Sequence, residues 1–108
     1  MIQQAYNNDI LNSNLIGLKE FTLWVSASND GWAASAIVID LTNIKKITFS
    51  GQIGSTLILS LRDASNNIYL SATANGEWDV STYSGLYFIH YDLRATINSS
   101  RSIDITLS

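Results

Sequence analysis

Two stretches of the chain decide its fold: Ile39-Asp40-Leu41-Thr42-Asn43-Ile44-Lys45-Lys46-Ile47-Thr48-Phe49 and Trp78-Asp79-Val80-Ser81-Thr82-Tyr83-Ser84-Gly85-Leu86-Tyr87-Phe88. Each places an aspartate after an apolar residue and a Ser or Thr two positions later, and each continues as an alternating strand. The carboxylate and hydroxyl can accept bonds from nearby backbone N–H groups and close a tight corner. The predicted corner residues are Asp40, Thr42, Asp79 and Ser81. A corner followed by a strand, used twice, predicts a sandwich with two similar halves.

The composition limits the class of protein. With 108 residues, 46% of them apolar, the chain is expected to form a single domain with one core. It contains no cysteine, so disulfides and thiolate metal sites are excluded. The net charge of −3 argues against nucleic acid as a partner, because that affinity depends on clustered Lys and Arg. No stretch approaches the length of a membrane span, and the amino terminus does not resemble a secretory signal.

Apolar residues recur at every second position over most of the chain, which is typical of half-buried strands. Turn residues such as Asn75-Gly76 separate the apolar segments. The expected strands cover residues 20–25, 33–39, 46–50, 56–62, 68–72, 86–93 and 102–107, and one more enters the second corner at Trp78. About eight strands at this spacing predict an all-β, antiparallel, jelly-roll-like β-sandwich. We expect residues 1–14 to form a polar N-terminal arm and residues 15–108 to form the sandwich domain.

The second stretch and the strand that follows it, Trp78 to Ile89, together with the segment from Ile39 to Gly51, resemble β-sandwich modules of bacteriophage tail, baseplate and fibre proteins. Such modules are similar to carbohydrate-binding jelly rolls. The resemblance implies a non-enzymatic virion module, located on the virion or extracellularly, that serves structural attachment and recognition of host-surface carbohydrate. It also implies other virion proteins and a host glycan as partners.

A sugar site needs aromatic rings on which a pyranose can stack, and polar groups for its hydroxyls. We predict a carbohydrate platform with the following members: Trp24, Tyr69, Tyr87, Tyr91, Asn67, Asp92 and Arg94. The alternative for all four rings is a structural role, since a small sandwich needs large side chains to fill its core and seal its ends.

No catalytic or metal site is predicted, and no cofactor. His90 is the one histidine, and it has no evident nucleophile or second ligand, which favours a hydrogen-bonded or interface residue. Asp40 and Asp79 could form a carboxylate pair for glycoside hydrolysis, but their matching surroundings favour the corner role. Asp30 and Asp63 lie in no dense acidic loop of the kind that binds calcium.

Oligomerisation is a further expectation. The chain has no proline to protect its edge strands, so we expect a symmetric homo-oligomer, and a trimer if the domain ends a fibre. The alternative function is a purely structural head-fibre, decoration or oligomerisation domain without a ligand, whose aromatic residues pack between subunits.

Overall fold

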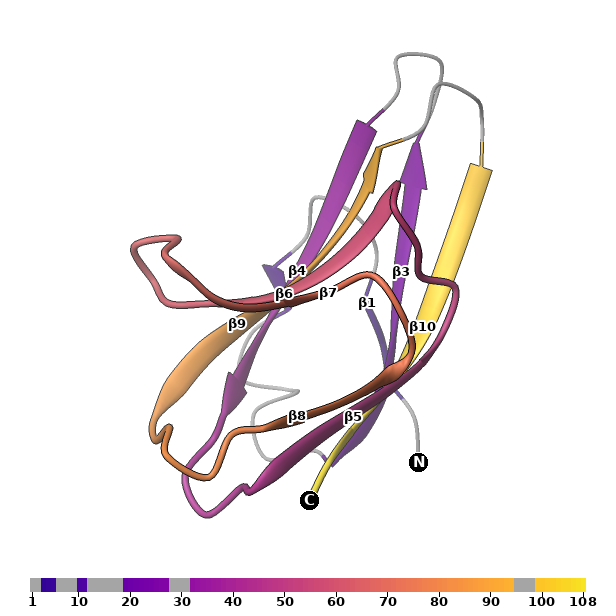
Figure 1. Cartoon of the computed structure of the whole chain (residues 1–108). Coiled ribbons are helices and arrows are strands. Elements are labelled where there is room, and N and C mark those ends of the chain that lie inside the picture. Colours follow the sequence, from indigo (N-terminus) through magenta and orange to yellow (C-terminus); the bar gives the residue numbers. More distant parts are fainter. Residues whose placement is uncertain (1–2, 6–9, 12–18, 28–31, 95–98) are drawn as a thin grey trace.

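The chain forms two facing β-sheets, as Figure 1 shows for the computed structural model. The structure describes residues 3–5, 10–11, 19–27, 32–94 and 99–108, and in these ranges it contains ten strands and no helix. The strands are β1 (Gln3–Ala5), β2 (Ile10–Leu11), β3 (Glu20–Ala27), β4 (Trp32–Asp40), β5 (Lys46–Gly51), β6 (Leu57–Arg62), β7 (Ile68–Ala72), β8 (Gly76–Asp79), β9 (Leu86–Arg94) and β10 (Ser99–Leu107). The described residues therefore hold no helix that could cross a membrane.

The strand order is that of a jelly roll. The first sheet has the order β1-β3-β10-β5-β8 and the second sheet has the order β2-β4-β9-β6-β7. From β3 onward, consecutive strands alternate between the sheets, except for the β6–β7 hairpin. Among these eight strands every pairing is antiparallel. The predicted all-β, jelly-roll-like sandwich is thus confirmed, and a jelly roll of eight strands is the usual size.

The apolar stripes of both sheets face each other and form one core. Because side chains alternate across a strand, every second residue reaches this layer. The core side chains on the strands of the first sheet are Phe21, Leu23, Val25, Ile47, Phe49, Trp78, Ile103, Ile105 and Leu107. Those on the second sheet are Ile37, Ile39, Leu57, Leu59, Leu61, Ile89, Tyr91 and Leu93. Burying this much apolar surface is the main stabilising term for a domain without disulfides.

The N-terminal segment contributes to both sheets. Strand β1 pairs in parallel with β3, and β2 pairs in parallel with β4. Each lies at an edge of its sheet. Where the sequence predicts a polar arm over residues 1–14, the described parts of that segment are therefore edge strands of the sandwich. The sequence did not reveal this role, because β1 and β2 contain only three and two residues, too few to show the alternation that marks a half-buried strand.

In both predicted corners the aspartate accepts a backbone N–H as expected, whereas the Ser81 hydroxyl donates a bond where the sequence predicted an acceptor. The N–H of Thr42 donates to Asp40 Oδ1 at 2.9 Å. The N–H and the hydroxyl of Ser81 donate to Asp79 Oδ1 at 3.0 Å and 2.7 Å. These bonds favour the ionised carboxylate, so the pKa of Asp40 lies below its usual value through the Thr42 N–H, and that of Asp79 through the Ser81 hydroxyl. Both carboxylates act as local caps of a turn.

The corners also contact each other. The first carries the chain from β4 to β5 and the second from β8 to β9, so both connect the two sheets. The N–H of Leu41 donates to the Gly85 carbonyl at 2.8 Å, and the N–H of Val80 donates to the Lys45 carbonyl at 2.8 Å. Leu41 and Val80 are fully buried, which anchors each corner in the core. The repeated sequence thus corresponds to two equivalent, adjoining bends at one end of the sandwich.

Candidate functional site

Several polar side chains lie close together on the outer face of the second sheet, the face that points away from the core. Residues 89, 91 and 93 of β9 point into the core, so Phe88, His90 and Asp92 point to the opposite face. On the neighbouring strand β6, Ser60 lies opposite His90 and Arg62 lies opposite Phe88. Three side chains of β9 and two of β6 therefore form a compact patch, which we call the outer-face site.

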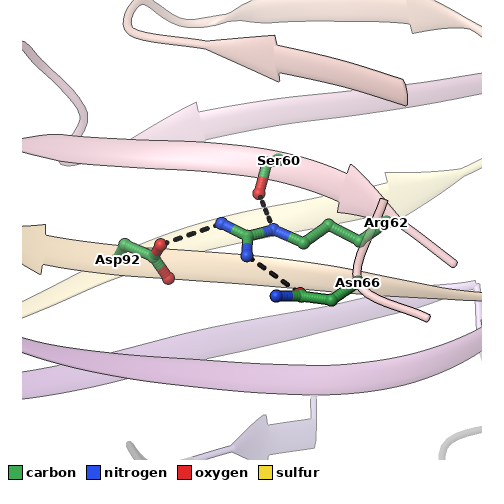
Figure 2. Close-up of polar contacts among 4 residues, drawn as sticks. All are labelled: Ser60, Arg62, Asn66 and Asp92. Carbon is green, nitrogen blue, oxygen red and sulfur yellow. Dashed lines mark hydrogen bonds and ion pairs between the residues drawn. The ribbon is translucent and has the colours of Figure 1, made fainter. Parts of the chain in front are cut away.

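Arg62 is the centre of this site, as Figure 2 shows. Its Nε donates to Ser60 Oγ at 2.9 Å, its Nη1 to Asn66 Oδ1 at 2.9 Å and its Nη2 to Asp92 Oδ2 at 3.1 Å. The side chains of Arg62 and Asp92 are only 15% and 6% exposed. The planar guanidinium thus joins β6, β9 and the β6–β7 loop through one set of charge-assisted bonds.

Asp92 is incompletely satisfied. Its Oδ2 accepts from Arg62, but its Oδ1 is buried and has no hydrogen-bond partner. A buried carboxylate oxygen without a donor carries a desolvation cost. The ion pair with Arg62 is therefore what keeps this charge tolerable on the sheet.

The β6–β7 loop is held by Asp63. Its Oδ1 accepts from the backbone N–H groups of Ser65 and Asn67 at 2.9 Å and 3.0 Å. Its Oδ2 accepts from Asn67 Nδ2 at 3.0 Å and from the Tyr69 hydroxyl at 2.9 Å. These donors, with the Asn67 side chain first, lower the pKa of Asp63. Asn66, at φ 69°, adopts the left-handed conformation that asparagine tolerates, and its side chain reaches Arg62.

A pocket of about 170 Å³ lies between this loop and β9. It is lined by Asp63, Ala64, Asn66, Phe88 and His90. Sites for drug-sized ligands have volumes of roughly 300–1,000 Å³, so this smaller pocket has room for a ligand about the size of a single ring. The pocket combines an aromatic ring with an imidazole and an amide, so it can offer a stacking surface and hydrogen bonds together.

The surroundings of His90 favour its neutral form. Desolvation lowers its pKa first, the Arg62 charge lowers it further, and the Asp92 charge partly opposes both. A neutral imidazole has one N–H donor and one nitrogen acceptor. His90 therefore presents both kinds of hydrogen-bonding group to a ligand in the pocket.

Ser60, His90 and Asp92 are the residue types of a hydrolytic triad, but their arrangement is not that of one. Ser60 is buried, and its Oγ accepts from Arg62. No hydrogen bond links His90 to Ser60 or to Asp92 among the described residues, whereas a triad requires both. No group of three or more His, Cys, Asp or Glu in the described ranges could hold a metal ion.

Three tyrosines cluster at the side of the sandwich. The ring centroids of Tyr69 and Tyr83 lie 5.9 Å apart, those of Tyr69 and Tyr87 5.6 Å, and those of Tyr83 and Tyr87 5.6 Å. Tyr83 and Tyr87 also pack against the core, whereas Tyr69 is 45% exposed. The bond to Asp63 raises the pKa of Tyr69. This cluster closes the sandwich between β7 and the second corner, and only its Tyr69 ring is broadly accessible.

The four rings of the predicted platform do not share one surface. Trp24 lies on β3 in the first sheet, whereas the three tyrosines lie on the second. Tyr91 is fully buried, its hydroxyl donates to the Gln52 carbonyl, and burial raises its pKa. Strand alternation places Tyr91 on the core face, and nothing in the sequence shows which of the two faces of β9 is the core. Only Tyr69 and Tyr87 come together.

The three predicted polar partners are also separated. Asp92 belongs to the outer-face site, and Asn67 supports the loop through Asp63. Arg94 is exposed at the end of β9, where its N–H donates to the Thr56 carbonyl at 2.7 Å. The prediction missed Arg62, Asn66 and Phe88. One usable signal was the charge of Arg62 on an otherwise apolar strand, since a buried cation requires an anionic partner on a neighbouring strand.

Comparison with known proteins shows which solved structures share this fold. No protein-family model matches the chain, and no curated protein does. Among solved structures, PliG of Aeromonas hydrophila, a periplasmic inhibitor of g-type lysozyme, is 11% identical over 100% of both chains, with a TM-score of 0.61. The pre-peptidase C-terminal domain of a Bacillus anthracis collagenase is 16% identical over 100% of this chain and 97% of that one, with a TM-score of 0.52.

A mitogen from Yersinia pseudotuberculosis is 14% identical over 81% of this chain and 86% of its own, with a TM-score of 0.53. At these identities the likenesses show a shared β-sandwich and carry nothing about ligands. None of the three is a phage protein, so the resemblance to phage modules stays a prediction. The function has to be argued from the outer-face site itself.

Proposed function

We propose that this protein is a non-enzymatic β-sandwich module that binds carbohydrate in the pocket between Phe88 and the β6–β7 loop. The observation that carries the proposal is the convergence of the Phe88 ring, the neutral His90 imidazole and the Asn66 amide on one pocket of about 170 Å³. An aromatic ring serves the apolar face of a pyranose, and the imidazole and amide serve its hydroxyls.

The pocket is preorganised, which supports a binding role. Arg62 holds the Asn66 Oδ1, so the amide is oriented with its Nδ2 donor available to a ligand. Asp63 fixes the loop through four hydrogen bonds. A rigid site loses little conformational freedom on binding, which improves the affinity of a small contact area.

We further propose that the module acts on a phage virion, in a tail, baseplate or fibre, where it contacts host-surface glycans. The support is the sequence resemblance of Trp78 to Ile89 to such modules. A pocket that takes one sugar ring is expected to bind with a dissociation constant of roughly 1 mM per copy. Several copies in a symmetric oligomer, such as a trimer, would make that affinity useful through multivalency.

The test is sugar binding measured by glycan array and by titration calorimetry. Phe88→Ala is expected to weaken binding at least tenfold, because the stacking surface is lost, and Ala64→Trp should block the pocket in a protein that keeps its core. Leu86→Ala is the matched control, since Leu86 is a 57% exposed apolar residue on the same strand outside the pocket. Failure of the wild-type protein to bind any glycan at millimolar concentration, or full binding by Ala64→Trp, would contradict the proposal.

A structural role is the second candidate, and one observation favours it. Ile68 and Leu86 are 59% and 57% exposed, and both are large apolar side chains on the second sheet. Contact with another subunit would cover them. Under this reading, an Ile68→Ser, Leu86→Ser variant loses the oligomer in sedimentation analysis and the wild-type protein shows no glycan binding.

A further inference from the structure

The side chains that line the pocket leave few hydrogen-bonding groups free for a ligand. Asp63 leaves none, because each of its oxygens already accepts two hydrogen bonds within the loop. The Asn66 amide is engaged on one side: its Oδ1 accepts from Arg62 Nη1 at 2.9 Å, whereas its Nδ2 donates to no described residue. A ligand in the pocket therefore meets the donor end of this amide.

His90 supplies an acceptor. Among the described residues, no group is hydrogen-bonded to its imidazole. On the neighbouring strand β6 it lies opposite Ser60, whose hydroxyl accepts from Arg62 instead. The surroundings of His90 favour its neutral form, in which one ring nitrogen donates and the other accepts. With Asp63 saturated and Asn66 Oδ1 held by Arg62, that ring nitrogen is the side-chain acceptor left for a ligand.

The other two lining residues are apolar and leave a place for a small apolar group. Phe88 contributes its ring from β9, and Ala64 contributes its methyl group from the loop. Asn66 also lies on the loop and His90 on β9, so the free donor and the free acceptor belong to opposite sides of the pocket. A trans secondary amide is complementary to this arrangement, because its C=O and N–H point in opposite directions in one plane.

We propose, on the basis of the carbohydrate-binding function above, that the pocket recognises the acetamido group of N-acetylated amino sugars. Asn66 Nδ2 donates to the acetamido carbonyl, His90 accepts from the acetamido N–H, and the methyl group packs against Phe88, all three being lining residues. Arg62 is the positioning residue, since it holds Asn66 Oδ1 and so presents the donor to the ligand. A ring edge that carries only hydroxyls fits less well, because each hydroxyl brings a donor, and a donor left unpaired loses its bond to water.

Titration calorimetry with matched methyl glycosides tests the proposal: glucose with N-acetylglucosamine, and galactose with N-acetylgalactosamine. The wild-type protein is expected to bind the N-acetylated member of each pair about tenfold more tightly, which is the effect of one to two neutral hydrogen bonds. The 2-O-acetyl ester of the glucoside keeps the carbonyl and the methyl group but has no N–H. It should bind about fivefold more weakly than the amide, since it has nothing to donate to His90.

Asn66→Asp tests the donor. The change removes Nδ2 and keeps an oxygen for Arg62, so the domain should stay folded while the preference for N-acetylated sugars is lost. Asn43→Asp is the matched control, because Asn43 is an exposed asparagine outside the pocket with nearly the same left-handed backbone, φ 64° against 69°. It should leave the preference unchanged.

The outcomes separate this proposal from the one on which it rests. Equal binding of both members of each pair by the wild-type protein would overturn acetamido recognition and leave carbohydrate binding intact. Absence of binding to every glycoside would overturn both. A full preference in Asn66→Asp would contradict the donor role of Asn66, and equal binding of the ester and the amide would contradict the acceptor role of His90. The comparison of ligands on the wild-type protein needs no variant to fold.

Discussion

Replacement of Arg62 by methionine is expected to destabilise the domain by about 3 kcal/mol at pH 7. The side chain would keep its apolar stem but lose its bonds to Ser60, Asn66 and Asp92. Deleting one partner of a buried ion pair costs about 3–5 kcal/mol, because the other charge stays buried without compensation. Asp92 is 6% exposed and already has one oxygen without a donor, and no other group in the described part of the chain is bonded to it in place of Arg62.

Urea denaturation followed by circular dichroism measures these differences. Lys46→Met is the control, since the Lys46–Glu77 pair is 48% and 57% exposed and its loss should cost under about 1 kcal/mol. The double variant Arg62→Met, Asp92→Leu should regain at least about 2 kcal/mol relative to Arg62→Met, because no charge remains buried. A loss below about 1 kcal/mol for Arg62→Met, or a double variant no more stable than the single one, would refute the reasoning.

Three further predictions concern single positions. Gly51→Ala should lower the free energy of unfolding by at least about 2 kcal/mol, because Gly51 has φ +147° and an added Cβ would lie 2.8 Å from backbone atoms of β10. Gly54→Ala is the control: a Cβ there meets nothing within 4 Å, so the free energy of unfolding should change by under about 0.5 kcal/mol. Tyr91→Phe should cost about 1 kcal/mol in the same assay, since it leaves the Gln52 carbonyl without its donor. The pKa of His90 is lowered in the folded state, so its contribution to stability is complete above about pH 6.5 and is lost as the pH falls below that value. His90→Gln should therefore make the free energy of unfolding depend less steeply on pH between pH 7 and pH 5. An unchanged slope would contradict this.

The aromatic residues have different roles in the structure from those predicted. Tyrosines on strands suggest a platform, yet Tyr91 fills the core and Tyr83 and Tyr87 seal its side. Phe88, one position along from Tyr87, faces outwards beside the pocket. A shift by one residue along a strand exchanges core and surface, so a sequence with apolar residues at both parities cannot show which set is displayed.

The sequence by itself determined the all-β class, the strands from β3 onward and the two corners. These features depend on local chemistry: alternation marks the strands, and an aspartate with a hydroxyl two residues later closes each bend. Only the tertiary structure decided that Arg62 meets Asp92 and that Asn66 and His90 line one pocket. Those contacts depend on which strands become neighbours and in which register, and strands distant in sequence are paired by the folding of the whole sandwich.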